Sequence, residues 1–165
     1  MDTMTEDPST LAVFYKGWSD YQTLLTKAIA PLTTEQLTLS VAPGLRSIST
    51  IVRHMIGGRA RWFHDMIGVG DEEFASLGRW DSKGAPERDA AELVFGLETS
   101  WRVMQEALAS WTPEEMLQSY ENDPGDEPAL FTRQWIIWHL IEHDLHHGGE
   151  VSLTLGLHGL QALDL

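Results

Sequence analysis

The segment TRQWIIWHLIEHDLHHGGEVSLTLGL, residues 132–157 of a 165-residue chain, carries the strongest structural signal in the sequence. Its apolar residues recur at steps of three and four, which is the spacing of an α-helix. We therefore predict a helix from about Leu130 to Leu155. At about 100° per residue, apolar side chains surround most of its circumference, a pattern typical of a buried helix.

Three further long helices are predicted upstream by the same periodicity. Their ranges are 11–29, 47–67 and 86–111. Ser47 can cap the second of these helices, and Pro86 suits the first helical position of the third. Gly57 and Gly58 would weaken the second helix unless another part of the chain packs closely against them.

The connecting segments contain turn and capping signals. A long loop is predicted over residues 68–85, a helix breaker over 121–128, and LQSYEN at 117–122 is the only strand candidate. Two capping boxes are predicted, one formed by Thr33 with Gln36 and the other by Thr112 with Glu115. Together the elements predict an all-α four-helix bundle with short extra helices. We expect one domain over residues 1–165, with about ten flexible residues at the N-terminus.

Composition limits the classes of partner. The formal charge is −14, from 25 acidic against 11 basic residues, and such a surface repels phosphate backbones, so we expect no nucleic-acid partner. No apolar run approaches the roughly 18 residues that a membrane span requires, so we expect no membrane partner. The absence of cysteine excludes disulfides and thiolate ligands, and it fits a cytoplasmic protein.

The histidines of the last predicted helix have the spacing of metal ligands. His143 and His147 are four residues apart, so they project from neighbouring turns of one face and can share an ion. A third ligand would have to come from another helix, and His54 fits better than His64, which points about 80° away on the same helix. Three histidine ligands leave coordination positions open, which is the pattern of a catalytic site.

Other readings of the same residues remain open at this stage. Buried histidines are often satisfied by a carbonyl or a carboxylate, and Glu142, Asp144 and Glu150 are near enough in sequence to do this. His139 stands one turn before His143, but a set reaching on to His147 would span about 12 Å of axial rise, too far for one ion. His146 points about 100° away from His147, so we expect it to make a neighbouring hydrogen bond instead.

The same residues carry a resemblance to a known family. The segment 132–157 resembles the last helix of the DinB superfamily, where a run of the form HxxxHxG[QE] matches His143, His147, Gly149 and Glu150. LRSISTIVRHMIGGRARWF, residues 45–63, resembles that family's second helix, whose single histidine maps onto His54. The resemblance implies a four-helix bundle of the up-down-down-up type with these three histidines as the metal ligands. Where the family often has arginine, this chain has Gly148.

The resemblance also implies a function. Members of the superfamily are usually metal-dependent hydrolase-like proteins or thiol transferases, so we expect a divalent metal ion, zinc or nickel, and a small electrophilic substrate. A low-molecular-weight thiol such as bacillithiol, mycothiol or glutathione is the expected second substrate. Bound water or thiolate would be the nucleophile, Glu150 or Glu142 a candidate proton acceptor, and Trp62 a candidate pocket wall.

The alternative is a non-catalytic bundle that binds metal or takes part in a stress response. We also predict a homodimer, because related bundles often pair through helix faces and apolar residues are in excess, Trp101 and Trp111 among them.

Overall fold

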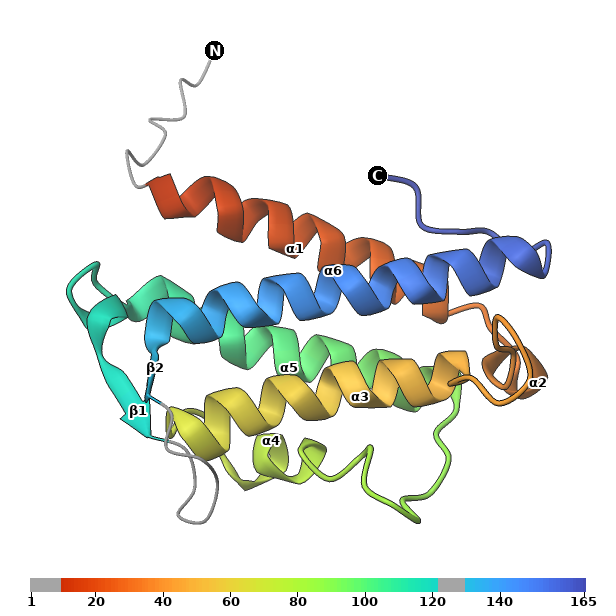
Figure 1. Cartoon of the computed structure of the whole chain (residues 1–165), viewed down its shortest axis with the longest axis horizontal. Coiled ribbons are helices and arrows are strands. Elements are labelled where there is room, and N and C mark those ends of the chain that lie inside the picture. The colour runs from red at the N-terminus through yellow and green to blue at the C-terminus, as the bar shows by residue number, and fades with distance from the viewer. Residues whose placement is uncertain (1–9, 122–129) are drawn as a thin grey trace.

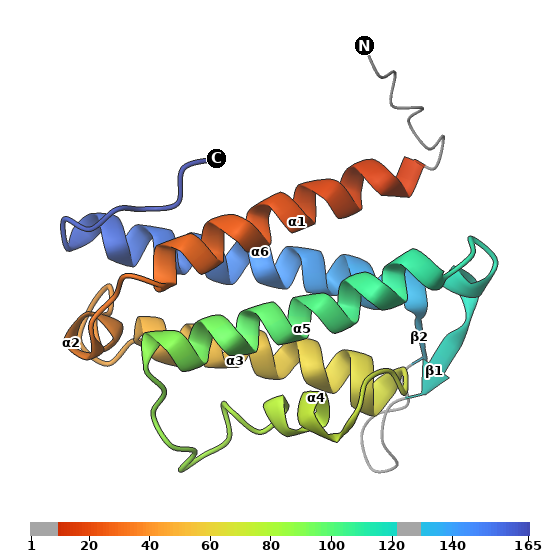
Figure 2. The same cartoon turned by 180° about the vertical axis from the view of Figure 1, so that it is seen from behind.

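Four long helices build the bundle in the computed structural model, which describes residues 10–121 and 130–165 (Figure 1). They are α1 (Thr10–Ile29), α3 (Ile48–Ala60), α5 (Ala90–Ser110) and α6 (Arg133–Leu157). Helices α1 and α6 run in one direction and α3 and α5 in the other, so the predicted up-down-down-up bundle is confirmed. Seen from behind, α5 lies between α1 and α3 (Figure 2). No described helix is long and apolar enough to cross a membrane.

Short elements join these helices. They are α2 (Thr34–Leu37), the π-helix η1 (Arg61–Met66), α4 (Glu72–Leu77), the 3-10 helix η2 (Glu115–Leu117), β1 (Ser119–Glu121) and β2 (Leu130–Thr132). The two strands pair antiparallel, with Tyr120 opposite Phe131, so the strand candidate at 117–122 is confirmed at its centre. The breaker at 121–128 lies almost wholly outside the described residues, as does the predicted flexible N-terminus.

Helix starts follow the capping signals. The Ser47 hydroxyl accepts from the Thr50 amide, and both predicted capping boxes form, since backbone and side-chain hydrogen bonds join each pair in both directions. The predicted start of α5 at Pro86 is wrong by four residues. Asp89 caps that helix instead, because its carboxylate accepts from the Glu92 amide, and the carbonyl of Pro86 accepts from Arg53.

Two other boundaries differ from the prediction. The last helix begins at Arg133 rather than Leu130, because residues 130–132 pair with β1 and Thr132 caps the helix. The predicted loop at 68–85 contains α4, whose start is capped by Asp71. Helical periodicity does not reveal this helix, because six residues are too few to show a repeat, although its Phe74 and Leu77 are buried.

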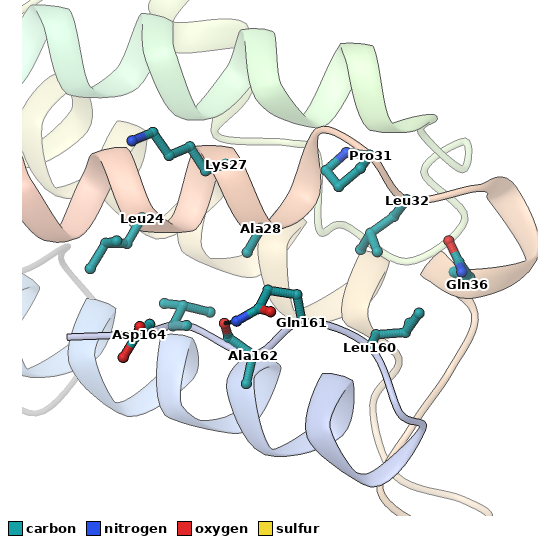
Figure 3. Close-up of a pocket in the computed structure, with 11 residues that line it drawn as sticks. Leu24, Lys27, Ala28, Pro31, Leu32, Gln36, Leu160, Gln161, Ala162 and Asp164 are labelled. Atoms are coloured by element: carbon teal, nitrogen blue, oxygen red, sulfur yellow. Dashed lines mark hydrogen bonds between the residues drawn. The ribbon is translucent and has the colours of Figure 1, made fainter.

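The outer face of α6 corrects the expectation of a helix buried on all sides. Large apolar side chains on that face are exposed: Trp138, Leu145, Leu153 and Leu157. The helix packs against α3 and receives hydrogen bonds from Trp18 and Tyr21 of α1. An apolar groove of about 470 Å³ lies between α1 and α6, with Phe14 and Trp138 in its lining. Residues 160–164 turn back toward the end of α1 and leave a second groove of about 460 Å³ there (Figure 3).

The tryptophans named for dimer formation are not free surface residues. Trp101 is 8% exposed, and its ring packs edge-on against Trp18 at 5.1 Å. Trp111 is half-buried and stacks on Phe63 at 5.6 Å. Both side chains therefore serve the packing of this chain, and the argument for a dimer from Trp101 and Trp111 is wrong.

A buried ion pair joins the four long helices. Arg59 of α3 and Asp144 of α6 are both fully buried, and the guanidinium donates to the carboxylate from Nε at 3.1 Å and from Nη2 at 2.8 Å. Ser100 of α5 accepts from Arg59 at 3.2 Å, and the indole of Trp18 in α1 donates to Asp144 at 2.7 Å. Only one sliding position of α3 against α6 makes these bonds, so the pair fixes the register of the two helices.

We expect Arg59→Met to destabilise the fold by about 3–5 kcal/mol, because it leaves the Asp144 carboxylate buried without a counter-charge. Arg59→Met with Asp144→Leu should be less destabilised than Arg59→Met alone, since no charge is then stranded. Urea unfolding measures both. Lys16→Met is the control, because its pair with Asp20 is solvent-exposed and should contribute no more than about 1 kcal/mol. A single Arg59→Met effect as small as that of Lys16→Met would contradict this account.

Candidate metal centre

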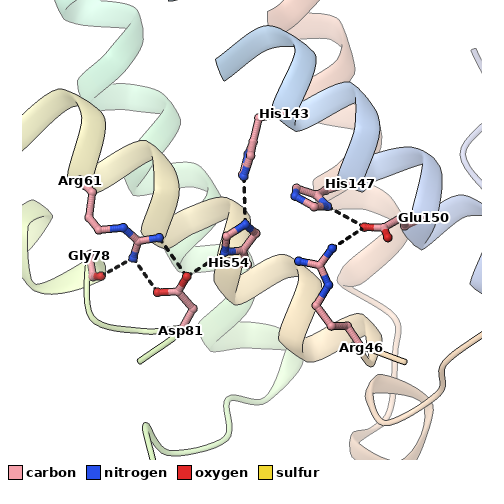
Figure 4. A network of polar contacts seen from close by, with 8 residues as sticks. All are labelled: Arg46, His54, Arg61, Gly78, Asp81, His143, His147 and Glu150. Carbon is pink, nitrogen blue, oxygen red and sulfur yellow. Dashed lines mark hydrogen bonds and ion pairs between the residues drawn. The ribbon is translucent and has the colours of Figure 1, made fainter. Parts of the chain in front are cut away.

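Three histidines from two helices converge on one point (Figure 4). His54 comes from α3, and His143 and His147 come from successive turns of α6. The Nε2 atoms of His54 and His143 are 3.1 Å apart, and one nitrogen from each of the three rings lies within 4.8 Å of the others. The structure thus brings together His54, His143 and His147, the three residues that the sequence predicts as ligands, and His64 is not among them.

The ring of His54 is held on its far side by a carboxylate. Its Nδ1 is 2.8 Å from Oδ2 of Asp81, which lies in the segment after α4. Arg61 donates to both oxygens of Asp81, from Nη1 at 2.6 Å and from Nη2 at 2.9 Å, and also to the carbonyl of Gly78 (Figure 4). Burial opposes ionisation of Asp81, but the hydrogen bonds from Arg61 and His54 outweigh it and hold the carboxyl pKa below its usual value.

His147 has the same kind of support from α6 itself. Its Nδ1 is 2.6 Å from Oε2 of Glu150, and Arg46 reaches the same oxygen at 3.3 Å. Burial lowers the pKa of His147 although the bond to Glu150 acts in the opposite direction. The pKa of Glu150 is also lowered: burial would raise it, but the contacts with His147 and Arg46 prevail. Glu150 is thereby occupied by two partners and is a poor proton acceptor at neutral pH.

His143 differs from the other two rings. Its Nδ1 is buried and has no hydrogen-bond partner among the described residues. Burial, together with the neighbouring rings of His147, His54 and His139 and the charge of Arg59, lowers the pKa of His143 to about 3. The imidazole is therefore neutral at physiological pH, which is the form that can bind a metal ion.

Glycines create the space for this arrangement. A Cβ on Gly58 would lie 3.2 Å from the His143 ring, and a Cβ on Gly57 would lie 2.7 Å from Oδ1 of Asp81. The expectation of a close approach at these two glycines is confirmed. Gly148, which stands where the family often has arginine, faces the hydroxyl of Tyr21 so closely that any larger side chain would clash.

The remaining histidines lie outside the cluster. His139 has its ring centre 6.0 Å from that of His143, and it stacks on Trp135 at 5.0 Å. His146 is exposed and makes no hydrogen bond with the described residues, so its expected bond is absent from them. His146, His147 and Glu150 do form a second close group, but it shares His147 with the first, and Glu150 is already paired with Arg46.

An aromatic cluster adjoins the histidines at the end of the site nearer β2. Trp62 of η1 meets Phe131 of β2 at 5.4 Å, Trp135 at 5.7 Å and His139 at 5.2 Å. Trp62 lies in the π-helix, an element that often occurs at functional sites. The cluster is half-buried apart from Trp135, which is 41% exposed. We call these four rings the aromatic wall.

The three histidines fit a divalent metal ion. Two nitrogens at about 2.1 Å from one zinc ion in tetrahedral geometry are about 3.4 Å apart, near the observed 3.1 Å between His54 and His143. The backing of Nδ1 by carboxylates is also typical of metal-binding histidines, because it turns the Nε2 lone pair toward the ion. The donor set is therefore chemically suited to bind metal through Nε2 atoms.

Comparison with known proteins identifies the family of this chain. The model of the DinB family matches residues 1–164. The chain belongs to the DinB family. The DinB fold also appears in solved structures of low sequence identity. A comparison with curated proteins finds no match.

Two solved structures share the fold of this chain. A DinB-like protein from Bacillus cereus ATCC 10987 has a TM-score of 0.70 at 19% identity, covering 94% of this chain and 97% of its own. A conserved protein from Enterococcus faecalis has a TM-score of 0.66 at 14% identity, covering 91% of this chain and 99% of its own. These likenesses establish the shared fold.

Sequence reasoning named Glu150 as a possible partner of a buried histidine but missed Asp81, Arg61 and Arg46. Asp81 belongs to a segment far from the histidines in sequence, and Arg61, although it lies in the same stretch as His54, carries no motif that marks it as a supporting residue. Arg46 escaped notice for the same reason. The one available signal was the Gly57–Gly58 pair inside a helix, which indicated a close approach without saying by what.

We expect the metal-free protein to lose stability as the pH falls below about 6.5, the usual value for histidine, toward 3. In that range the unfolded chain binds a proton at His143 and the folded chain does not, so protonation favours unfolding. His143→Gln should therefore show a smaller drop in melting temperature between pH 7 and pH 5 than wild type, measured with chelator present. His146→Gln, which changes an exposed histidine, should behave like wild type. Equal drops in all three proteins would refute this role of His143.

Proposed function

We propose that the protein is a divalent-metal-dependent enzyme with His54, His143 and His147 as the ligands. The observation that carries the proposal is the convergence of three ring nitrogens within 4.8 Å, with the Nδ1 atoms of His54 and His147 each held by a carboxylate. Zinc or nickel is the expected ion, because neutral imidazole suits both. Three protein ligands leave positions open for a substrate, unlike a closed structural site.

The reaction we propose is attack by a thiol or by water on a small electrophile. A bound divalent ion supplies the chemistry that both nucleophiles need at neutral pH, because it lowers the pKa of a coordinated thiol or water. The chain's own residues orient two of the imidazoles through Asp81 and Glu150, and burial lowers the pKa of His143 and His147. Glu150, with its proton-accepting capacity reduced, orients His147 in this scheme rather than acting as a general base.

The aromatic wall supports an apolar substrate. It begins at His139, one helical turn before His143, and continues to Trp62, Phe131 and Trp135 on the side of the site away from Arg46 and Glu150. Apolar pockets with a few placed polar groups are the usual form of small-molecule sites. We propose that the electrophile lies against this wall, and that a charged low-molecular-weight thiol would be oriented by the opposite, charged end of the site. The cytoplasmic location and the homodimer stay predictions.

Replacing a ligand should empty the site, whereas replacing a neighbouring histidine should not. We expect His54→Ala, His143→Ala and His147→Ala each to lower metal affinity by far more than the 10- to 100-fold expected when a supporting contact is lost. His139→Ala and His146→Ala should stay within that smaller range. Metal content after purification and competition with a chelator measure the affinities.

The same variants give a second readout in thermal stability. A metal that binds only the folded state stabilises it by about 2.7 kcal/mol at a hundredfold excess over Kd. A chelator should thus lower the melting temperature of wild type and of His146→Ala, and leave that of His143→Ala unchanged. If His146→Ala proved empty while His147→Ala kept its metal, the proposed ligand set would be wrong. Metal uptake without turnover of any electrophile by thiol or water would favour the non-catalytic alternative.

Two exposed tryptophans of α6 form a matched pair for testing the aromatic wall. Trp135 belongs to the wall, whereas Trp138 points to the groove between α1 and α6. We expect Trp135→Ala to raise KM for an aromatic electrophile such as 1-chloro-2,4-dinitrobenzene about tenfold or more, with little change in metal content. Trp138→Ala should leave KM within about twofold, and equal effects of the two changes would reject the wall as a substrate contact. The tenfold figure corresponds to about 1.4 kcal/mol of lost aromatic contact.

A further inference from the structure

We infer that Asp81 is a positioning residue for His54, and that Arg61 acts through it. Its carboxylate would hold His54 with the proton on Nδ1 and the lone pair of Nε2 turned toward His143 and His147. This inference rests on the metal site proposed above and adds to it a residue from outside the two ligand-bearing helices. The segment that follows α4 and carries Asp81 thereby becomes part of the site.

The contacts leave one consistent proton assignment for the neutral ring of His54. Oδ2 of Asp81 lies 2.8 Å from His54 Nδ1, and Arg61 donates to both oxygens of the carboxylate, so Asp81 is an acceptor toward the ring. His54 must then donate from Nδ1, and its Nε2 carries the lone pair. The opposite tautomer would place a hydrogen on Nε2, where a metal ion would have to bind.

The local backbone accommodates this arrangement at a cost in helix propensity. Gly57 lies one turn after His54, in the middle of α3, where alanine would favour the helix. A Cβ at position 57 would lie 2.7 Å from Oδ1 of Asp81 and 2.9 Å from Nη1 of Arg61. The glycine therefore provides the space in which the carboxylate and the guanidinium meet.

A carboxylate paired with an arginine also stands behind His147, but none is found behind His143 among the described residues. Glu150 and Arg46 stand behind His147 as Asp81 and Arg61 stand behind His54. His143 has no such partner on Nδ1 among the described residues. Orientation of the three rings is thus unequal, and the two carboxylates set two of them before any ligand arrives.

In a simpler interpretation, Asp81 acts only as a clamp: its ion pair with Arg61 holds the segment that follows α4 in place. The two readings differ in what two variants should do. Asp81→Ala and Arg61→Met both break the same ion pair, but only Asp81→Ala removes the acceptor from His54. A clamp predicts equal effects of the two changes, whereas a positioning residue predicts a larger effect of Asp81→Ala on the metal.

The experiment measures zinc affinity by chelator competition and the His54 tautomer by ¹⁵N-detected ring correlations of the metal-free protein. For Asp81→Ala we expect a 10- to 100-fold loss of zinc affinity and a His54 signal that is no longer purely the Nδ1–H form. Arg61→Met should retain that tautomer and lose less affinity. Asp65→Ala is the matched control, because it breaks a similar carboxylate–histidine contact, 2.9 Å long, with His64 outside the site.

Gly57→Ala provides a test in which helix propensity and metal binding change in opposite directions. We expect it to weaken zinc binding even though alanine favours the helix, since its Cβ displaces the Asp81 carboxylate. Gly17→Ala is the control, because nothing lies within 4 Å of a Cβ at that helical position and zinc affinity should be unchanged.

Equal zinc affinities for Asp81→Ala and Arg61→Met, with the His54 tautomer unaltered, would overturn the inference while leaving the metal site intact. If wild type binds no zinc or nickel, the proposed function fails, and the tautomer of metal-free Asp81→Ala still decides whether Asp81 orients His54.

Discussion

The buried pair of Arg59 and Asp144 is the interaction on which the rest of the structure depends. It is the point where all four long helices touch one polar network, because Ser100 and Trp18 complete its hydrogen bonds. A buried charge without its partner is strongly destabilising, so alternative registers of α3 against α6 are disfavoured. His143 is adjacent to Asp144 in the chain, and the helix position fixed by the ion pair brings its ring over Gly58 and toward His54.

Close helix approach is the second constraint, and glycine provides it at the points where the site is assembled. Gly57 and Gly58 are consecutive, and each faces a different part of the site, the Asp81 carboxylate and the His143 ring respectively. These glycines weaken α3 as an isolated helix, and tertiary packing offsets the loss. Local propensity and global fold thus disagree most at the candidate site, which is where function is expected to override propensity.

The site is chemically asymmetric along α6. The aromatic wall around Trp62 and Trp135 borders its end near β2, whereas Arg46 and Glu150 border the other end. The π-helix η1 carries both Arg61, which holds Asp81, and Trp62, which is part of the aromatic wall, so one irregular turn supplies both a support for a ligand and a lining residue. The rigid bundle provides the ligands, and the less regular segments around it provide the contacts that distinguish one member of a fold from another.

The sequence by itself predicted the four-helix bundle and the three histidines that lie together in it. Helical periodicity is a local property, and the i, i+4 spacing of His143 and His147 places two rings on one face of any regular helix. Only the tertiary structure decided which carboxylates stand behind the rings. Asp81 is 27 residues from His54 and follows α4, a helix too short to be recognised by its periodicity. The tertiary structure also decided that Trp101 is core and Trp138 is surface, since a helical repeat shows which residues share a face and not what that face meets.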